Sequence, residues 1–278
     1  INKTGVTVDF AGSDSVLSPK ELEDYRLAHN SAGNSVENKW GPLIQIPSAA
    51  TSVTIPYKLT LANGTPVTDL NLTSAQLCSI FSGAVTNWKD IKAGYPDKAI
   101  QVFYRSGSSG TTEILSRHLN VHCASQFGVN GTFTTAQVGA EPATFSAVAS
   151  SSAMATSATT TEGAIGYVGP EDVDATNNAK VARVNGLLPT VGNVVTALAS
   201  VAPPATVADR ADPTKWAPVL PNPASGYALV AYTNLIFGQC YKDVADGTNI
   251  RDFLTRHYGL TTNNDTEIEA KKLIPLNN

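Results

Sequence analysis

Residues 99–120 read AIQVFYRSGSSGTTEILSRHLN, and this stretch joins three kinds of local structure. It opens with a nearly continuous apolar run, which is typical of a strand at the centre of a parallel sheet with both faces covered. Small hydroxyl residues and glycines follow, and apolar residues then recur at helical spacing. A strand, a glycine-rich loop and a helix in this order predict one unit of an α/β fold.

The alternation of strands and helices continues along the rest of the chain. Residues 43–59 and 226–237 are apolar and rich in β-branched and aromatic residues, as strands are. Residues 71–88 and 249–258 contain helical patterns. We therefore predict an α/β protein of two lobes. Each lobe is a mixed, mostly parallel sheet flanked by helices, and the ligand lies in the cleft between the lobes.

Two proline-rich stretches, near 47–56 and 201–223, are candidate crossings between these lobes. We assign residues 1–50 and 223–278 to lobe I and residues 51–222 to lobe II, which then carries the glycine-rich loop. Because open α/β sheets bind ligands where loops leave the carboxyl ends of strands, this loop is the first candidate site.

The glycine-rich loop has the residue types of an oxyanion site. Arg105 can offer two parallel N–H donors, and Ser109 and Thr111 can offer hydroxyl donors. Gly110 stands where the helix begins, and the first turn of a helix has unpaired backbone N–H groups and a partial positive charge. The loop therefore predicts a bound tetrahedral anion.

A solvated turn with Ser109 as an ordinary N-cap explains the same residues equally well. Two sharper motifs fail on spacing. No lysine follows Gly110, as a Walker loop requires, and residues 107–110 are one residue short of a GxSxG elbow. His118 and His122 lie too far along the helix to serve as a base for Ser109.

Asp14 follows the first predicted strand, in the sequence AGSDS at 11–15. An aspartate in a turn most often caps the backbone that follows it. Beside an anion, its carboxylate would repel a fully ionised ligand but would accept the proton of hydrogen phosphate in a short hydrogen bond. Sulfate carries no such proton at neutral pH, so Asp14 in an anion site would select phosphate over sulfate.

Charge and composition exclude several classes of function. The 278 residues include 15% charged residues and have a net charge of −4, so no basic field would attract nucleic acid. No apolar run approaches the roughly 20 residues of a membrane helix. The abundance of Ser, Thr, Ala, Gly and Asn is typical of a periplasmic or secreted protein.

Cys78, Cys123 and Cys240 form no CxxC pair, and the four histidines are scattered. The sequence therefore indicates neither a zinc site nor any other cofactor. In an oxidising compartment, three cysteines allow one disulfide and leave one residue over.

Several stretches of the chain together resemble the DING proteins, a branch of the high-affinity phosphate-binding proteins of the type 2 periplasmic-binding class. They are AGSDS (11–15), LIQIPSAATSVTIPY (43–57), LCSIFSGAVTNW (77–88), YRSGSSGTTE (104–113), GAIGYV (163–168), SGYALVAYTNLIFGQCY (225–241) and RDFLTRHYG (251–259). The resemblance implies the two-lobed type 2 periplasmic-binding-protein fold with phosphate in the cleft.

The resemblance also implies particular residue roles. The implied phosphate contacts are Asp14, Arg105, Ser109, Gly110 and Thr111. A Cys78–Cys123 disulfide is implied as well, and Cys240 is left without the partner that the family carries beyond residue 278. The family's other phosphate ligands come from loops that precede the AGSDS turn. We therefore interpret the chain as a fragment that lacks both ends, with lobe I incomplete.

One departure from the family concerns the arginine. An acidic residue usually stands two positions after it and pins the guanidinium by an ion pair, whereas this chain has Gly107. Arg105 is then expected to be freer and to lose more conformational entropy when an anion binds.

The resemblance implies a phosphate-scavenging binding protein of the transport type, with an ABC-transporter permease as partner in the intact family. Two alternatives stay open. One is a phosphomonoesterase that uses the same anion site, because some DING-type proteins are associated with phosphatase activity. The other is an extracellular interaction protein with an impaired site. An uncovered strand edge at the shortened N-terminal side would favour pairing with a second copy, so a homodimer is expected.

Overall fold

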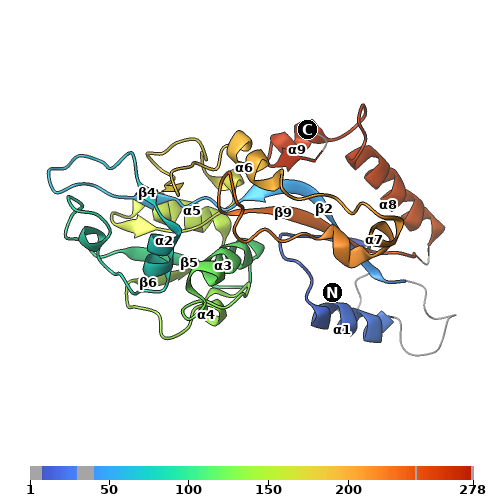
Figure 1. The fold of residues 1–278 in the computed structure, drawn as a ribbon, viewed down its shortest axis with the longest axis horizontal. Coiled ribbons are helices and arrows are strands. Elements are labelled where there is room, and N and C mark those ends of the chain that lie inside the picture. Colours follow the sequence, from blue (N-terminus) through green and yellow to red (C-terminus); the bar gives the residue numbers. More distant parts are fainter. Residues whose placement is uncertain (1–7, 30–40, 242, 277–278) are drawn as a thin grey trace. The chain divides into compact units, whose positions relative to one another are not determined.

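The structure is a computed structural model, which describes residues 8–29, 41–241 and 243–276. The chain divides into two compact units. Unit 1 comprises residues 1–50, 201–219 and 232–278, and unit 2 comprises residues 51–200 and 220–231. The chain therefore passes between the units four times. Two of these passages lie within long strands, β2 (Leu43–Ser52) and β9 (Val230–Gly238), which are neighbours in one sheet (Figure 1).

The sheet that contains β2 and β9 has the strand order β1-β9-β2-β10. Its two outer strands are short: β1 (Phe10–Ser13) and β10 (Ile274–Pro275). The other elements of unit 1 are α1 (Pro19–His29), α7 (Val207–Ala211), η3 (Pro213–Trp216), α8 (Val244–His257) and α9 (Asp265–Glu269).

Unit 2 contains a four-stranded sheet with the order β3-β7-β5-β6 and a two-stranded parallel sheet. The strands are β3 (Tyr57–Lys58), β7 (Ala164–Ile165), β5 (Gln101–Arg105) and β6 (Phe145–Val148), and then β4 (Asn71–Leu72) and β8 (Arg183–Val184). The helices are α2 (Ser74–Phe81), η1 (Trp88–Asp90), α3 (Gly110–Cys123), α4 (Phe133–Ala136), α5 (Ser151–Thr160), η2 (Pro170–Asp172) and α6 (Val191–Leu198).

The central position predicted for the strand before the glycine-rich loop is confirmed. Strand β5 lies between β7 and β6 and is parallel to both. The α/β fold with mixed sheets is confirmed too, but parallel pairing is less general than expected. The described pairings of β1 with β9 and of β10 with β2 are antiparallel. An apolar run indicates a buried strand, but only the connections between strands decide its direction.

The division into units differs from the predicted lobes in two segments. Residues 201–219 belong to unit 1, where Thr214 and Ala217 line an apolar depression together with Leu17 and Leu43. Residues 223–231, which we assigned to lobe I, belong to unit 2. The reason is packing: proline-rich composition marks these residues as loop, but their contacts with other segments decide which unit they join.

Residue Tyr227 shows how the second of these segments is held in unit 2. Its backbone N–H donates to the carbonyl of Asn193 at 2.9 Å. Its buried hydroxyl donates to the carbonyl of Val53, also at 2.9 Å. These two bonds fix the segment against α6 and against the chain that follows β2.

An aromatic cluster that includes Tyr104 of β5 forms part of the core of unit 2. The ring of Phe133 stacks on Tyr104 with centroids 4.8 Å apart and on Tyr167 with centroids 6.1 Å apart. Phe81 and Phe127 meet Phe133 edge-on, and both are fully buried. Aromatic rings packed in this way stabilise the fold by more than their buried area alone predicts. The contact of Tyr104 with Phe133 therefore helps to hold the end of β5 in place.

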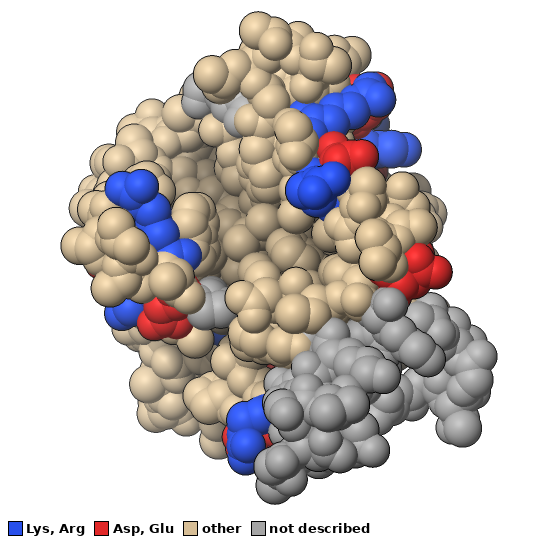
Figure 2. Space-filling view, turned by 90° about the vertical axis from the view of Figure 1, so that its right-hand side faces the viewer, with Lys and Arg blue, Asp and Glu red and all other residues tan. Residues whose placement is uncertain are grey.

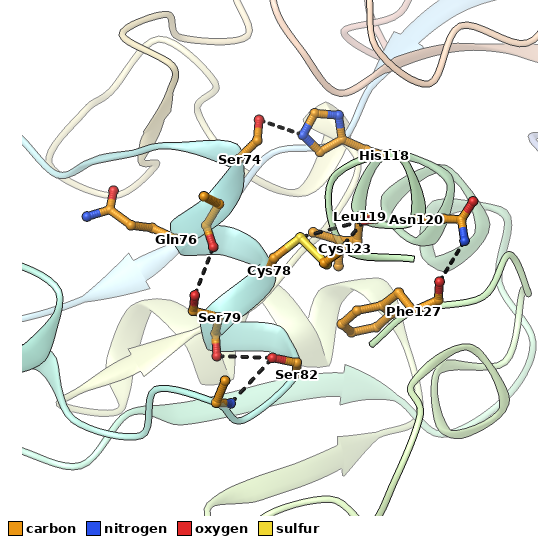
Figure 3. Close-up of a disulfide and its surroundings, with 12 residues drawn as sticks. Ser74, Gln76, Cys78, Ser79, Ser82, His118, Leu119, Asn120, Cys123 and Phe127 are labelled. Atoms are coloured by element: carbon orange, nitrogen blue, oxygen red, sulfur yellow. Dashed lines mark hydrogen bonds between the residues drawn. A yellow bond between two sulfur atoms is a disulfide. The ribbon is translucent and has the colours of Figure 1, made fainter. Parts of the chain in front are cut away.

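The predicted Cys78–Cys123 disulfide is confirmed, and it joins α2 to α3 (Figure 3). Cys240 is a free and exposed thiol. In the part of the chain that the structure describes, no helix combines the length and apolar character needed to cross a membrane. Figure 2 shows the charged side chains of one face in a few separate groups of mixed sign, with uncharged residues between them.

Candidate anion-binding site

The glycine-rich loop connects the two elements that the sequence predicted. Strand β5 ends at Arg105, and α3 begins at Gly110 with Ser109 at the N-cap position. The Ser109 side chain makes no capping hydrogen bond, although its backbone is extended as in an ordinary N-cap. Ser109 therefore takes the position of a cap without committing its hydroxyl to that role.

The first turn of α3 presents unused backbone donors. The helical ladder starts with the N–H of Glu113, which donates to the carbonyl of Ser109 at 3.1 Å. Within residues 8–29, 41–241 and 243–276, no acceptor is found for the backbone N–H groups of Gly110, Thr111 and Thr112. Such groups, together with the positive end of the helix dipole, attract an anion.

The hydroxyl of Tyr167 forms hydrogen bonds with residues at both ends of the loop. It accepts the backbone N–H of Arg105 at 3.1 Å and lies 2.8 Å from Oγ1 of Thr112 in the first turn of α3. Burial raises the pKa of Tyr167 to about 12, so the hydroxyl keeps its proton at neutral pH. With its proton directed to Thr112, the same oxygen remains free to accept from Arg105.

The middle of the loop is held by backbone contacts from distant segments. Ser106 donates its N–H to the carbonyl of Val148 at 2.9 Å, and Ser109 donates its N–H to the carbonyl of Gly131 at 2.8 Å. A Cβ atom at Gly131 would lie only 2.8 Å from Oγ of Ser108. The glycine thus leaves room for the side chain of Ser108, which would have to rotate if a Cβ stood at position 131.

The guanidinium of Arg105 has a partner that the sequence did not suggest. Its Nη1 donates to Oγ of Ser151, the first residue of α5, at 3.1 Å. Its Nε is buried and has no hydrogen-bond partner among the described residues. A side chain built at Gly107 would meet nothing within 4 Å, so that position is open and the arginine is held from α5 instead.

Asp14 lies in unit 1, half-buried, in the bend that directly follows β1. The preceding residue, Ser13, pairs with Asn234 of β9 and accepts the N–H of Ser15 on its Oγ at 3.0 Å. Asp14 and the loop belong to different units, and the contact of Asp14 with a bound anion stays a prediction.

Neither ring nitrogen of His118 is available to activate Ser109. One lies 2.9 Å from the carbonyl of Pro221 and the other 2.9 Å from Oγ of Ser74 (Figure 3). Burial lowers the pKa of His118 to about 4, so the ring is neutral at pH 7. Among the described residues, no group of three or more His, Cys, Asp or Glu side chains is placed to hold a metal ion.

Comparison with known proteins agrees with this arrangement. A protein-family model described as a PBP superfamily domain matches residues 2–255. The structure of a phosphate-binding protein from Stenotrophomonas maltophilia is similar, with a TM-score of 0.85 at 39% identity over 98% of this chain and 77% of that one. The phosphate-bound structure of the high-affinity periplasmic phosphate-binding protein PfluDING gives a TM-score of 0.84 at 38% identity over 99% and 77%. This chain belongs to the DING family of the PBP superfamily.

One relative that is similar in sequence to this DING-family chain is named as an enzyme. Alkaline phosphatase L of Pseudomonas aeruginosa is 50% identical over 273 residues, which are 97% of this chain and 71% of that protein. Proteins named for phosphate binding and a protein named as a phosphatase are thus both similar to this chain.

Within unit 2 of this DING-family chain, the structure brings Arg105, Ser109, Gly110 and Thr111 together as a strand end, a loop and a first helical turn. Sequence reasoning missed Tyr167 and the two other supporting residues, Gly131 and Ser151. Tyr167 lies in the stretch GAIGYV, which takes part in the family resemblance, and local pattern offers no signal for the other two positions.

Proposed function

We propose that the chain binds inorganic phosphate, as hydrogen phosphate, at the first turn of α3. One observation carries the proposal: α3 opens with three successive N–H groups that have no acceptor among the described residues, and Ser109 at its N-cap position keeps its hydroxyl uncommitted. Arg105 ends the strand before the same loop. Donors alone, with a helix dipole behind them, suit a tetrahedral oxyanion. The relatives named phosphate-binding proteins support this choice of anion.

Asp14 supplies the preference for phosphate over sulfate in this proposal. Its carboxylate would accept the P–O–H proton of hydrogen phosphate. Sulfate would leave the same carboxylate without a proton to accept, beside a doubly charged anion. A single acceptor among many donors thus distinguishes two anions of equal shape and similar size.

Isothermal titration calorimetry tests the proposal. Purified protein freed of bound anion should release or absorb heat on titration with phosphate and should show none with sulfate at the same ionic strength. Arg105→Ala should weaken phosphate binding, and Asp14→Asn should narrow the gap between the two anions. Phosphate binding that is unchanged in Arg105→Ala would show that the site has been assigned to the wrong residues.

Phosphomonoester hydrolysis is the second candidate, and the 50% identical relative named Alkaline phosphatase L favours it. The same donors could hold a transferable phosphoryl group, with Asp14 as acid or base. Turnover of a chromogenic phosphomonoester should then co-purify with the protein and disappear in the Arg105→Ala, Ser109→Ala double variant. Activity that persists in the double variant would come from a contaminant.

The cellular setting follows from the same proposal. A phosphate-binding protein of this family would act in the periplasm or outside the cell, where the Cys78–Cys123 disulfide is stable. A transporter permease would be its partner for uptake.

We also propose a homodimer through the outer edge of β1, which lies at the end of the strand order in its sheet. Light scattering after size exclusion measures this directly, and a monomer at all concentrations would refute the dimer.

A further inference from the structure

We infer that Ser151 is the positioning residue of the proposed phosphate site: its hydroxyl orients the guanidinium of Arg105 toward the anion without cancelling its charge. The inference rests on the proposed function and adds a residue to that site. It comes from one contact, Nη1 of Arg105 to Oγ of Ser151 at 3.1 Å, and from the way the fold brings these residues together.

The sheet of unit 2 places Ser151 beside the loop. Strands β5 and β6 are parallel, and their last residues, Arg105 and Val148, are paired in register. The segments that follow parallel strands leave the sheet at the same edge. The segment after β6 reaches α5 within three residues, so the first turn of α5 lies next to the loop that follows β5.

Ser151 is not needed to cap its own helix. The N-cap of α5 is Ser150, whose side chain accepts the N–H of Ala153 at 3.1 Å. This leaves the hydroxyl of Ser151 to serve as an acceptor for Arg105. Its neighbour Ser152 is exposed and contacts only Ser150 among the side-chain hydrogen bonds described, with their Oγ atoms 3.4 Å apart.

The environment of Arg105 makes an orienting partner necessary. Its Nε is buried without a partner among the described residues, and Gly107 has no side chain to offer. An arginine side chain loses rotamer entropy when it is held in one conformation, so a partner that holds it before binding lowers the cost of binding. A serine hydroxyl is neutral, and the full positive charge therefore remains for the anion, whereas a carboxylate would offset it.

Calorimetric titration with inorganic phosphate tests the inference in the full chain. Ser151→Ala should raise the Kd for phosphate about tenfold to a hundredfold, the usual effect of losing one hydrogen bond to a charged group. Ser151→Thr keeps a hydroxyl at the same place and should restore most of the affinity. Ser152→Ala is the matched control and should bind phosphate like the wild type.

A double-variant cycle separates positioning from general loss of structure. In an Arg105→Ala background, Ser151→Ala should cause no further change in the Kd for phosphate, because the hydroxyl has nothing left to orient. An equal fold-change in both backgrounds would overturn the inference. So would a phosphate Kd for Ser151→Ala equal to that of the wild type.

A measurement without phosphate distinguishes failure of this inference from failure of the proposed function. In the ligand-free protein, the NMR order parameter of the Arg105 Nε–H bond should be high in the wild type and in Ser152→Ala, and low in Ser151→Ala. Absence of phosphate heat in the wild type would refute the proposed function. An order parameter that does not change in Ser151→Ala would refute the orienting role, whatever the wild type binds.

Discussion

The hydroxyl of Tyr167 accepts the backbone N–H of Arg105 at 3.1 Å, at the residue where β5 ends and the glycine-rich loop begins. The same hydroxyl lies 2.8 Å from Oγ1 of Thr112, in the first turn of α3. One buried oxygen therefore sets the separation between the arginine and the helix N-terminus that would share the anion.

Removal of this hydroxyl should affect both stability and binding. Tyr167→Phe leaves the N–H of Arg105 and the hydroxyl of Thr112 buried without their partner, which typically costs about 1–3 kcal/mol. Urea unfolding should show this loss of stability. Calorimetry should show weaker phosphate binding, because Arg105 and Thr112 no longer bond to a common hydroxyl at the two ends of the loop. Tyr57→Phe is a control from the same sheet, since its buried hydroxyl bonds carbonyls far from the loop. Equal phosphate affinity in Tyr167→Phe and wild type would contradict this prediction.

A methyl group at Gly131 should crowd the side chain of Ser108 in the loop. Its Cβ would lie 2.8 Å from Oγ of Ser108 and 3.4 Å from the carbonyl oxygen of Ser109. The side chain of Ser108 can rotate away from this Cβ, while the N–H of Ser109 stays bound to the carbonyl of the same glycine. We expect Gly131→Ala to weaken phosphate binding about threefold, since about 0.7 kcal/mol is a factor of three. Gly107→Ala is the matched control, because a Cβ there meets nothing within 4 Å; equal losses in both variants would refute the steric explanation.

His118 should make the stability of the protein depend on pH. Burial lowers the pKa of His118 to about 4 in the folded chain, whereas an unfolded histidine titrates near 6.5. Between these values the unfolded state binds more protons, so stability is fully present above pH 6.5 and is lost as the pH falls toward 4. The shift corresponds to a loss of up to about 3 kcal/mol.

Urea unfolding at pH 7, 5.5 and 4 checks this expectation. Carboxyl groups titrate in the same range, so the informative quantity is the difference in pH dependence between wild type and His118→Gln. The variant should be less stable at pH 7, because the bonds to Ser74 and to the carbonyl of Pro221 are changed, and should lose less stability on acidification. Parallel pH profiles would show that His118 is not the responsible group.

Reduction of the Cys78–Cys123 disulfide should destabilise unit 2. The bond closes a loop of 45 residues and joins α2 to α3, and bonds of this kind contribute about 2–4 kcal/mol. The double variant Cys78→Ala, Cys123→Ala should show this loss in urea unfolding without added reductant. Cys240→Ser, which removes the free exposed thiol, is the control and should unfold like the wild type. A loss for Cys240→Ser as large as that for the double variant would contradict the assignment.

The sequence by itself determined the local structure around the candidate site. The apolar run that ends at Arg105 became the central parallel strand, and α3 begins at Gly110 as predicted. Those features depend on propensity and periodicity over a few neighbouring residues, which the sequence shows directly. The disulfide came from family resemblance instead, because three cysteines alone leave the pairing open.

Only the tertiary structure decided what holds the loop. Tyr167 and Ser151 are 62 and 46 residues away from Arg105 in the chain. Gly131, in a third segment, accepts the N–H of Ser109 on its carbonyl. The directions of the strands in unit 1 and the unit to which residues 201–219 belong were decided in the same way. The physical reason is common to all of them. Local patterns specify which element forms. Which elements become neighbours depends on how buried surfaces from distant parts of the chain pack and how their polar groups form hydrogen bonds.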